Sequence, residues 1–234
     1  MNTLLKTLIG LVLSTSLAWA SDTVNIDVSV TTDAAACTPT LSNNGIVDFG
    51  KRSAALLSAT HFTQWGSRDI TLNIVCEAST AVAITARDSR PDSVAYGQDG
   101  NGNTGPDVPF QGQGNISNPE RLFGLGKTSE GKNIGSYAIV IDQESVQAQN
   151  AGSAVPVSIV SASTTAGPWS IASPAAFSSG MNGYLSFARK NSTTLQPVTT
   201  VVVPLRVSAS IASGLTSGNT IGLDGLATIT LVYL

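Results

Sequence analysis

The sequence predicts an all-β protein with a sandwich architecture, and three observations lead to this fold class. Several short segments alternate apolar and polar residues with a period of two, which is the pattern of a strand with one buried face. Clusters of Gly, Asn, Pro and Ser separate these segments, as turns between strands require. No segment shows convincing amphipathic helical periodicity. Short strands joined by turns are typical of a β-sandwich.

The expected strands extend over the chain from residue 24 to its end. A turn signal at Asn43-Asn44-Gly45 precedes the second of them, and Pro204 predicts that the sixth is an edge strand or contains a bulge. The predicted strands cover residues 24–31, 46–49, 70–76, 82–86, 137–141, 201–207 and 227–233.

Two regions between the strands predict long insertions in a single domain. Residues 97–118 are rich in Gly and Asn and lack periodicity, which indicates a loop. Residues 149–180 are rich in Ser, Ala and Pro and carry few firm strand signals.

The last strand is the most regular, because four residues of one face alternate with Thr228, Thr230 and Val232 on the other. A terminal segment usually frays unless a partner holds it. We therefore expect a strand beside this one, and the four residues facing the core are Ala227, Ile229, Leu231 and Tyr233.

Residues 1–20 have the features of a secretory signal peptide. Lys6 is followed by an apolar run through Leu17 and by Ala18-Trp19-Ala20, so cleavage is expected after Ala20. The alternative is a membrane anchor, but the apolar run is shorter than the roughly 20 residues that span a bilayer. We expect export, with residues 21–36 forming an N-terminal extension and residues 37–234 the main domain.

The two cysteines, Cys37 and Cys76, predict one disulfide. An even cysteine count in an exported protein favours a bridge over free thiols. Closing a loop of this length should stabilise the fold by about 4 kcal/mol on the chain-entropy estimate.

The composition excludes some function classes, and no motif points to catalysis. With a net charge of −3 and 12% charged residues, the chain has no basic patch for nucleic acid. Residues 126–133 resemble a phosphate-binding loop but carry Asn133 where Ser or Thr should follow the lysine. Residues 99–110 open like a calcium loop but lack its Gly and Glu. His61, the single histidine, has no serine elbow near it. We predict no catalytic, metal or cofactor residues, and therefore not an enzyme.

The order of these features resembles the subunits of chaperone–usher fimbriae, the surface fibres of Gram-negative bacteria. The resemblance is carried by the signal peptide, the alternating arm TVNIDVSVT, the opening ACTPTL, a second cysteine about 40 residues later, and the closing strand ATITLVYL. The segments CTPTLSNNGIVDFGK and RLFGLGKTSEGKNIGSYAI are also similar to a longer branch of fimbrial proteins.

The resemblance implies an immunoglobulin-like sandwich that lacks its last strand. In such subunits a periplasmic chaperone lends a strand beside the C-terminal strand, and in the fibre the arm of a neighbouring subunit replaces it. Assembly at the outer membrane needs an usher, and the product is a cell-surface fimbrium. By this resemblance the closing-strand residues named above contact the chaperone, and the residues donated to the neighbour are Val24, Ile26, Val28 and Val30.

Two alternatives remain open. The first alternative to a donated arm is that this segment is the first strand of its own domain, with the C-terminal strand completed inside the same chain. The chain also exceeds a typical pilin in length. The second alternative is therefore that it is a minor or tip-near subunit with adhesive loops and not the main structural subunit. In that role Trp169, Tyr184 and Phe187 would offer an aromatic platform for a host glycan or protein receptor.

Overall fold

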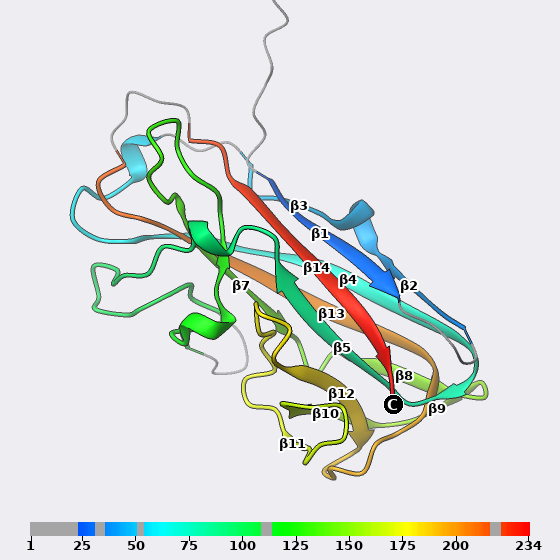
Figure 1. Ribbon diagram of the computed structural model, residues 1–234. Coiled ribbons are helices and arrows are strands. Elements are labelled where there is room, and N and C mark those ends of the chain that lie inside the picture. Colours follow the sequence, from blue (N-terminus) through cyan, green and yellow to red (C-terminus); the bar gives the residue numbers. More distant parts are fainter. Residues whose placement is uncertain (1–22, 31–35, 51–53, 109–113, 216–220) are drawn as a thin grey trace, which may run out of the picture.

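The fold is a two-layer β-sandwich, and its structure is a computed structural model that describes residues 23–30, 36–50, 54–108, 114–215 and 221–234. Figure 1 shows the long strands of both layers running along the length of the molecule, with loops gathered at one end. The predicted signal peptide, residues 1–20, lies outside the described residues. Within them, no helix combines the length and the apolar character needed to cross a bilayer.

The first sheet contains both the first and the last strand of the chain. Its order in space is β11 (Ser170–Ile171), β10 (Val157–Ala162), β12 (Tyr184–Arg189), β5 (Val82–Asp88), β14 (Asp224–Tyr233), β1 (Thr23–Val30) and β3 (Ile46–Asp48). Figure 1 shows β5, β14, β1 and β3 side by side at the front.

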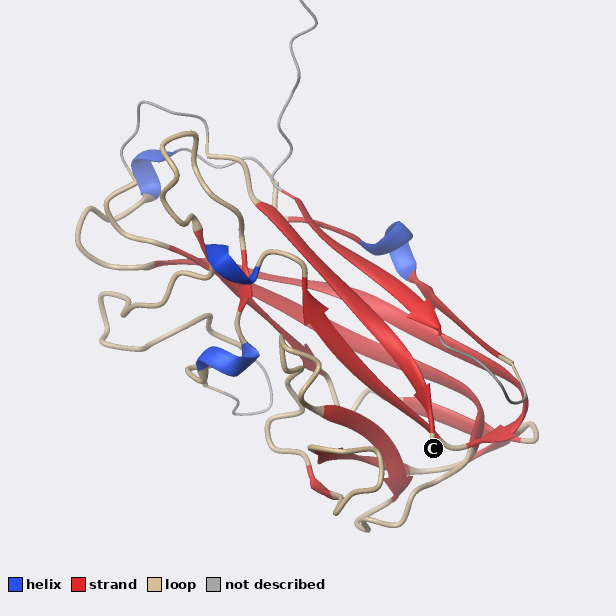
Figure 2. Cartoon of the chain, viewed as in Figure 1, coloured by secondary structure: helices blue, strands red, loops and turns tan. Residues whose placement is uncertain are grey.

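The second sheet packs behind the first. Its order is β2 (Cys37–Leu41), β4 (Thr63–Thr80), β13 (Val198–Ile211), β7 (Gly135–Ile141) and β6 (Phe123–Gly124), with β8 (Gln147–Asn150) beside β13 and β9 (Ser153–Ala154) beside β8. Figure 2 shows that the described helical turns are short and lie outside the sheets. They are η1 (Ser42–Gly45), η2 (Ala54–Leu56), η3 (Pro91–Ser93) and η4 (Pro119–Arg121).

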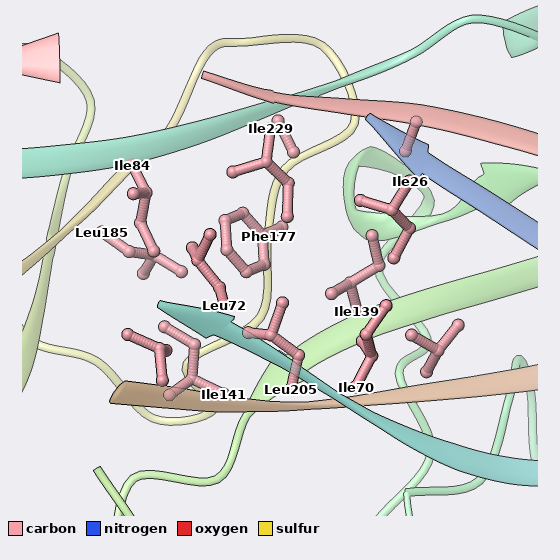
Figure 3. Close-up of a cluster of buried hydrophobic side chains, with 14 of the residues drawn as sticks. Ile26, Ile70, Leu72, Ile84, Ile139, Ile141, Phe177, Leu185, Leu205 and Ile229 are labelled. Carbon is pink, nitrogen blue, oxygen red and sulfur yellow. The ribbon is translucent and has the colours of Figure 1, made fainter. Parts of the chain in front are cut away.

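The all-β sandwich predicted from the alternating segments is confirmed. Strands form in every segment where they were expected, because residues of one parity face the layer between the sheets. The Asn43-Asn44-Gly45 turn is also confirmed, since all three residues have positive φ. Figure 3 shows the resulting core, in which Ile26, Ile229 and Ile139 meet from three different strands.

One strand was missed and one expectation was wrong. Most residues of 149–180 lie in loops, but the region also contains β10, whose Val157 and Ile159 are buried against the core. Pro204 does not mark an edge or a bulge, since β13 lies between β4 and β7 and its register is regular there. The proline is tolerated because β13 changes partner at this point, from β8 at Thr200–Val202 to β7 from Leu205 onward.

Segments on either side of β6 cover the outer face of the second sheet. Ile116 and Leu122 pack there against Ala138 and Val140 of β7 in a second apolar cluster. The predicted loop 97–118 is therefore anchored to the sheet over much of its described length. Its turn is closed by Asp99, whose carboxylate accepts hydrogen bonds from the backbone N–H groups of Asn101 and Asn103.

Buried serine hydroxyls on β13 and β7 lead to a stability prediction. Ser208 is fully buried, and its hydroxyl has no hydrogen-bond partner among the described residues. A buried hydroxyl without a partner carries its full desolvation cost, so Ser208→Ala should raise the free energy of unfolding by about 1 kcal/mol. Urea denaturation of both proteins measures the difference.

The matched control is Ser186→Ala. Ser186 is equally buried, but its hydroxyl donates to the carbonyl oxygen of Val82 at 2.7 Å. Losing that bond should lower the free energy of unfolding by about 1 kcal/mol. Destabilisation of similar size in both variants would contradict the distinction.

Candidate functional site: the groove filled by β1

The strand β1 fills a groove between β14 and β3. It runs parallel to β14 over eight paired positions, from Thr23 opposite Asp224 to Val30 opposite Leu231. On its other side it pairs antiparallel with β3 over three positions. The free arm that we expected is therefore not found, and the groove is closed within the single chain.

The four predicted donor residues differ in how they meet the core. Val24 and Ile26 are fully buried, at 0% and 1% exposure, and Val28 packs partly buried at the edge of the core. For Val30 the backbone pairs with Leu231, and its side chain lies outside what the structure describes. The predicted alternation is thus confirmed for the residues that can be assessed, and the donor role stays a prediction.

The predicted groove residues lie together on β14. Ala227, Ile229 and Leu231 are completely buried in the core, and Tyr233 packs against it partly buried. Figure 3 shows Ile26 of β1 and Ile229 of β14 pointing into the same layer of side chains. The structure therefore brings the two predicted residue sets side by side.

Two glycines permit this close packing, and sequence reasoning missed both. A Cβ on Gly225 would lie 2.7 Å from the ring of Tyr137 and 3.1 Å from Val24. Gly45 has a φ of +77°, and a Cβ there would lie 2.0 Å from the backbone oxygen of Ile26. The sequence marks Gly45 only as a turn residue, and nothing in it reveals that β1 passes beside it.

A stack centred on Arg68 holds β3 in place at the outer side of the groove. The Arg68 guanidinium donates to the carbonyl oxygens of Asp48 at 3.0 Å and Phe49 at 3.2 Å. Its Cζ also lies 5.6 Å from the centre of the Phe49 ring, within reach of a cation–π interaction. Because Arg68 belongs to β4, these contacts connect the two sheets at the edge that β3 protects.

A buried acid joins the end of β5 to the segment that follows it and to β6. The two carboxylate oxygens of Asp88 accept hydrogen bonds from the backbone N–H groups of Arg90 and Gly124, both at 2.8 Å. Burial raises the pKa of Asp88, although these two N–H groups and the charge of Arg90 oppose the shift. The contribution of Asp88 to the free energy of unfolding is therefore fully present below the pKa of an unfolded aspartate. It is lost as pH rises through the raised pKa of the folded state.

Two further contacts complete this end of the groove. The Arg90 guanidinium pairs with the carboxylate of Asp224, the first residue of β14. Burial also raises the pKa of Tyr137 well above its ordinary value, and the charge of Asp88 adds to the effect. Tyr137 stacks on Phe123 with ring centres 5.2 Å apart, which fills the floor beneath Gly225.

The opposite end of the groove is fixed by the disulfide and the penultimate tyrosine. The predicted bridge between Cys37 and Cys76 is confirmed, and it joins directly opposed residues of β2 and β4. The backbone N–H of Cys37 donates to the hydroxyl of Tyr233 at 2.7 Å. The point where the N-terminal segment enters the main domain is therefore tied to the end of β14.

The Tyr233 hydroxyl gives a second prediction. Tyr233→Phe keeps the ring but leaves the Cys37 N–H without this acceptor, so the free energy of unfolding should fall by about 1 kcal/mol. Tyr96→Phe is a suitable control, because its hydroxyl donates to the Ser117 carbonyl oxygen in an exposed position and should matter less. Equal unfolding midpoints for wild type and Tyr233→Phe would show that the bond contributes nothing.

The other residues considered in the sequence do not assemble into a site. His61 is exposed and contacts the hydroxyl of neighbouring Thr60. In the part of the chain that the structure describes, no group of acidic, histidine or cysteine residues could hold a metal ion. Phe187 is buried at 2% exposure, so it cannot form an exposed platform with Trp169 and Tyr184.

Comparisons with known proteins place the chain in a family. Residues 26–138 match a family described as proteins of unknown function, DUF1120, and the match begins inside β1. The chain is similar to the uncharacterized protein YhcF of Escherichia coli (strain K12), with 46% identity over 221 residues that cover 93% of both chains. It is also similar to protein GltF of the same organism, with 29% identity over 236 residues covering 93% of this chain and 91% of GltF. This protein belongs to the DUF1120 family.

Proposed function

We propose that the protein is a structural subunit of a bacterial surface fimbria, and that its subunits join by exchanging β1. In this proposal β1 leaves its own groove and enters the groove of a neighbouring subunit. A periplasmic chaperone would cover the emptied groove before assembly, and an outer-membrane usher would receive the subunit. The protein would thus pass through the periplasm to the cell surface.

The observation that carries the proposal is the position of β1 near the edge of its sheet, from which the strand can leave. Among the described strands it pairs only with β14 and the short β3, and residues 31–36 connect it to the main domain. If β1 departs, β14 keeps its pairing with β5, and the short β3 loses its three paired positions with β1. What remains is a β14 edge without partners above an apolar floor, which is a template for a strand from another chain.

The direction of β1 also supports exchange. Six residues separate Val30 from Cys37, and Cys37 is bound to Tyr233 at the far end of β14. Since this connection is short, β1 must end near Tyr233, and inside its own domain it runs parallel to β14. Parallel pairs are slightly less stable per residue than antiparallel pairs. A strand from a second molecule has no such connection and is free to insert antiparallel.

The driving force for filling the groove is moderate. Burying Val24 and Ile26 contributes roughly 1.5–3 kcal/mol each before the cost of ordering the strand. The same side chains make the same kind of contact in either groove, so exchange conserves most of this energy. Main-chain hydrogen bonds and the parity of the buried residues set the register in both cases.

A covalent lock tests the proposal. Ser29 and Thr230 are register partners whose hydroxyl oxygens lie 3.1 Å apart, so cysteines at both positions are placed to form a disulfide. The Ser29→Cys/Thr230→Cys chain should keep its fold but hold β1 in its own groove. A labelled peptide of residues 22–32 then reports on exchange, and electron microscopy reports on fibres.

The expected result is that the unlocked chain takes up the peptide and forms oligomers, while the locked chain does neither. Ser29→Cys alone is the control, since it changes the same surface without closing a bridge. Equal peptide uptake and oligomer formation by the locked chain would contradict the proposal. An unlocked chain that never exchanges β1, even with excess peptide, would identify β1 as a permanent first strand instead.

A further inference from the structure

A pocket lies on the face of the first sheet that is turned away from the core. It has a volume of about 480 Å³ and is lined by Arg87, Asp88, Ser89, Met181, Thr228 and Thr230. Pockets for small ligands typically measure about 300–1,000 Å³. Thr228 lies directly opposite Arg87 across the β5–β14 pair, so these two outward-facing side chains rise from neighbouring positions.

The charge available in the pocket is that of Arg87. Its side chain is exposed, and no described residue forms an ion pair or hydrogen bond with its guanidinium. The nearby Asp88 forms no ion pair with Arg87: its two carboxylate oxygens accept backbone N–H groups, and the residue is 3% exposed. The next arginine along the chain, Arg90, is already paired with Asp224. An unpaired guanidinium presents a planar set of donors that fits a carboxylate.

The remaining lining supplies hydroxyl groups and one apolar surface. The hydroxyls of Thr230 and Ser29 bond to each other at 3.1 Å, which leaves one of the two protons free to donate outward. Met181 is 39% exposed although it is apolar, and it has a φ of +59°. Its backbone N–H donates to the carbonyl oxygen of Ala86 at 3.0 Å, which holds this residue beside the sheet. The positive φ is a backbone conformation that residues other than glycine seldom adopt.

We propose that this pocket binds a small saccharide that carries a carboxylate. The carboxylate lies on the Arg87 guanidinium, the sugar hydroxyls bond to Thr228, Thr230 and Ser89, and an apolar face of the ring rests on Met181. Most of this site is independent of β1 exchange, because Arg87, Met181 and Thr228 stay in place when β1 leaves, and only the Thr230 hydroxyl loses its bond to Ser29.

Titration with sialic acid, followed by NMR chemical shifts or calorimetry, tests the site. Binding should be weakened about tenfold or more by Arg87→Gln and clearly weakened by Thr228→Val, which removes a hydroxyl with little change of shape. Arg189→Gln is the matched control, because Arg189 is also exposed but is the last residue of β12 and does not line the pocket. It should bind as the wild type does.

Neutral and simple anionic probes define the ligand class. Galactose should bind much more weakly than sialic acid, and acetate should bind more weakly as well, since each lacks part of the recognised chemistry. Acetate binding as strong as sialic acid would reduce the site to a bare anion contact and overturn the proposal. No saturable binding of sialic or glucuronic acid, or binding that Arg87→Gln leaves unchanged, would overturn it too.

Discussion

Replacing Ile26 by aspartate should destabilise the isolated chain by at least about 3–5 kcal/mol. Ile26 is 1% exposed and belongs to the central core, on the strand β1 that pairs with β14. Truncating such a residue alone costs about 2–5 kcal/mol, and a carboxylate buried there would add a desolvation penalty. Since small proteins have only about 5–15 kcal/mol of stability, the variant should be largely unfolded at moderate urea. Fluorescence of the buried Trp65 provides the measurement.

Asn25→Asp is the matched control for this prediction. Asn25 precedes Ile26 on the same strand but is exposed, so it receives the same charge on the opposite face. Its free energy of unfolding should stay within about 0.5 kcal/mol of wild type. If Ile26→Asp were as stable as Asn25→Asp, β1 would spend its time outside the groove in solution.

The second large effect is expected from removing the disulfide. Cys37→Ser combined with Cys76→Ser should lower the free energy of unfolding by about 4 kcal/mol, because the bridge closes a loop between residues 39 apart. The loss should be larger than that of Tyr233→Phe, although both changes act at the same end of the groove. Urea denaturation of the oxidised and variant proteins measures it.

Reduced wild type offers an internal check on the disulfide prediction. Its unfolding midpoint should match that of the double serine variant, since both lack the same covalent link. A double variant as stable as the oxidised wild type would mean that the two sheets hold β2 in place without the bridge. A variant much less stable than the reduced wild type would point to damage from the serines themselves.

The sequence was sufficient to predict the strands that alternate cleanly. The period of two in residues 227–233 requires one buried face, and Ala227, Ile229 and Leu231 lie there. The disulfide followed from the even cysteine count in a chain that is expected to be exported. In contrast, β10 was missed because serines and prolines surround Val157 and Ile159, and its burial depends on neighbours that are distant in sequence.

The partner of β1 could not be predicted from its own residues. The alternation of Val24 and Ile26 requires an apolar groove but is the same whether that groove belongs to this chain or to another. The direction of β1 depends on where Cys37 is anchored, which is a property of the assembled fold. The saccharide pocket was invisible for a similar reason, because Arg87, Met181 and Thr228 meet only when three separate segments are packed together.

The parallel pairing of β1 with β14 determines how the protein would respond to mechanical load. Thr23 lies beside Asp224, while Leu231 lies beside Val30, so pulling on the beginning of β1 and the end of β14 draws the two strands lengthwise past each other. Such tension loads all the rungs between them together, in shear, instead of opening them one after another as in a zipper. A single subunit stretched between its two ends would therefore resist force where its first and last strands meet.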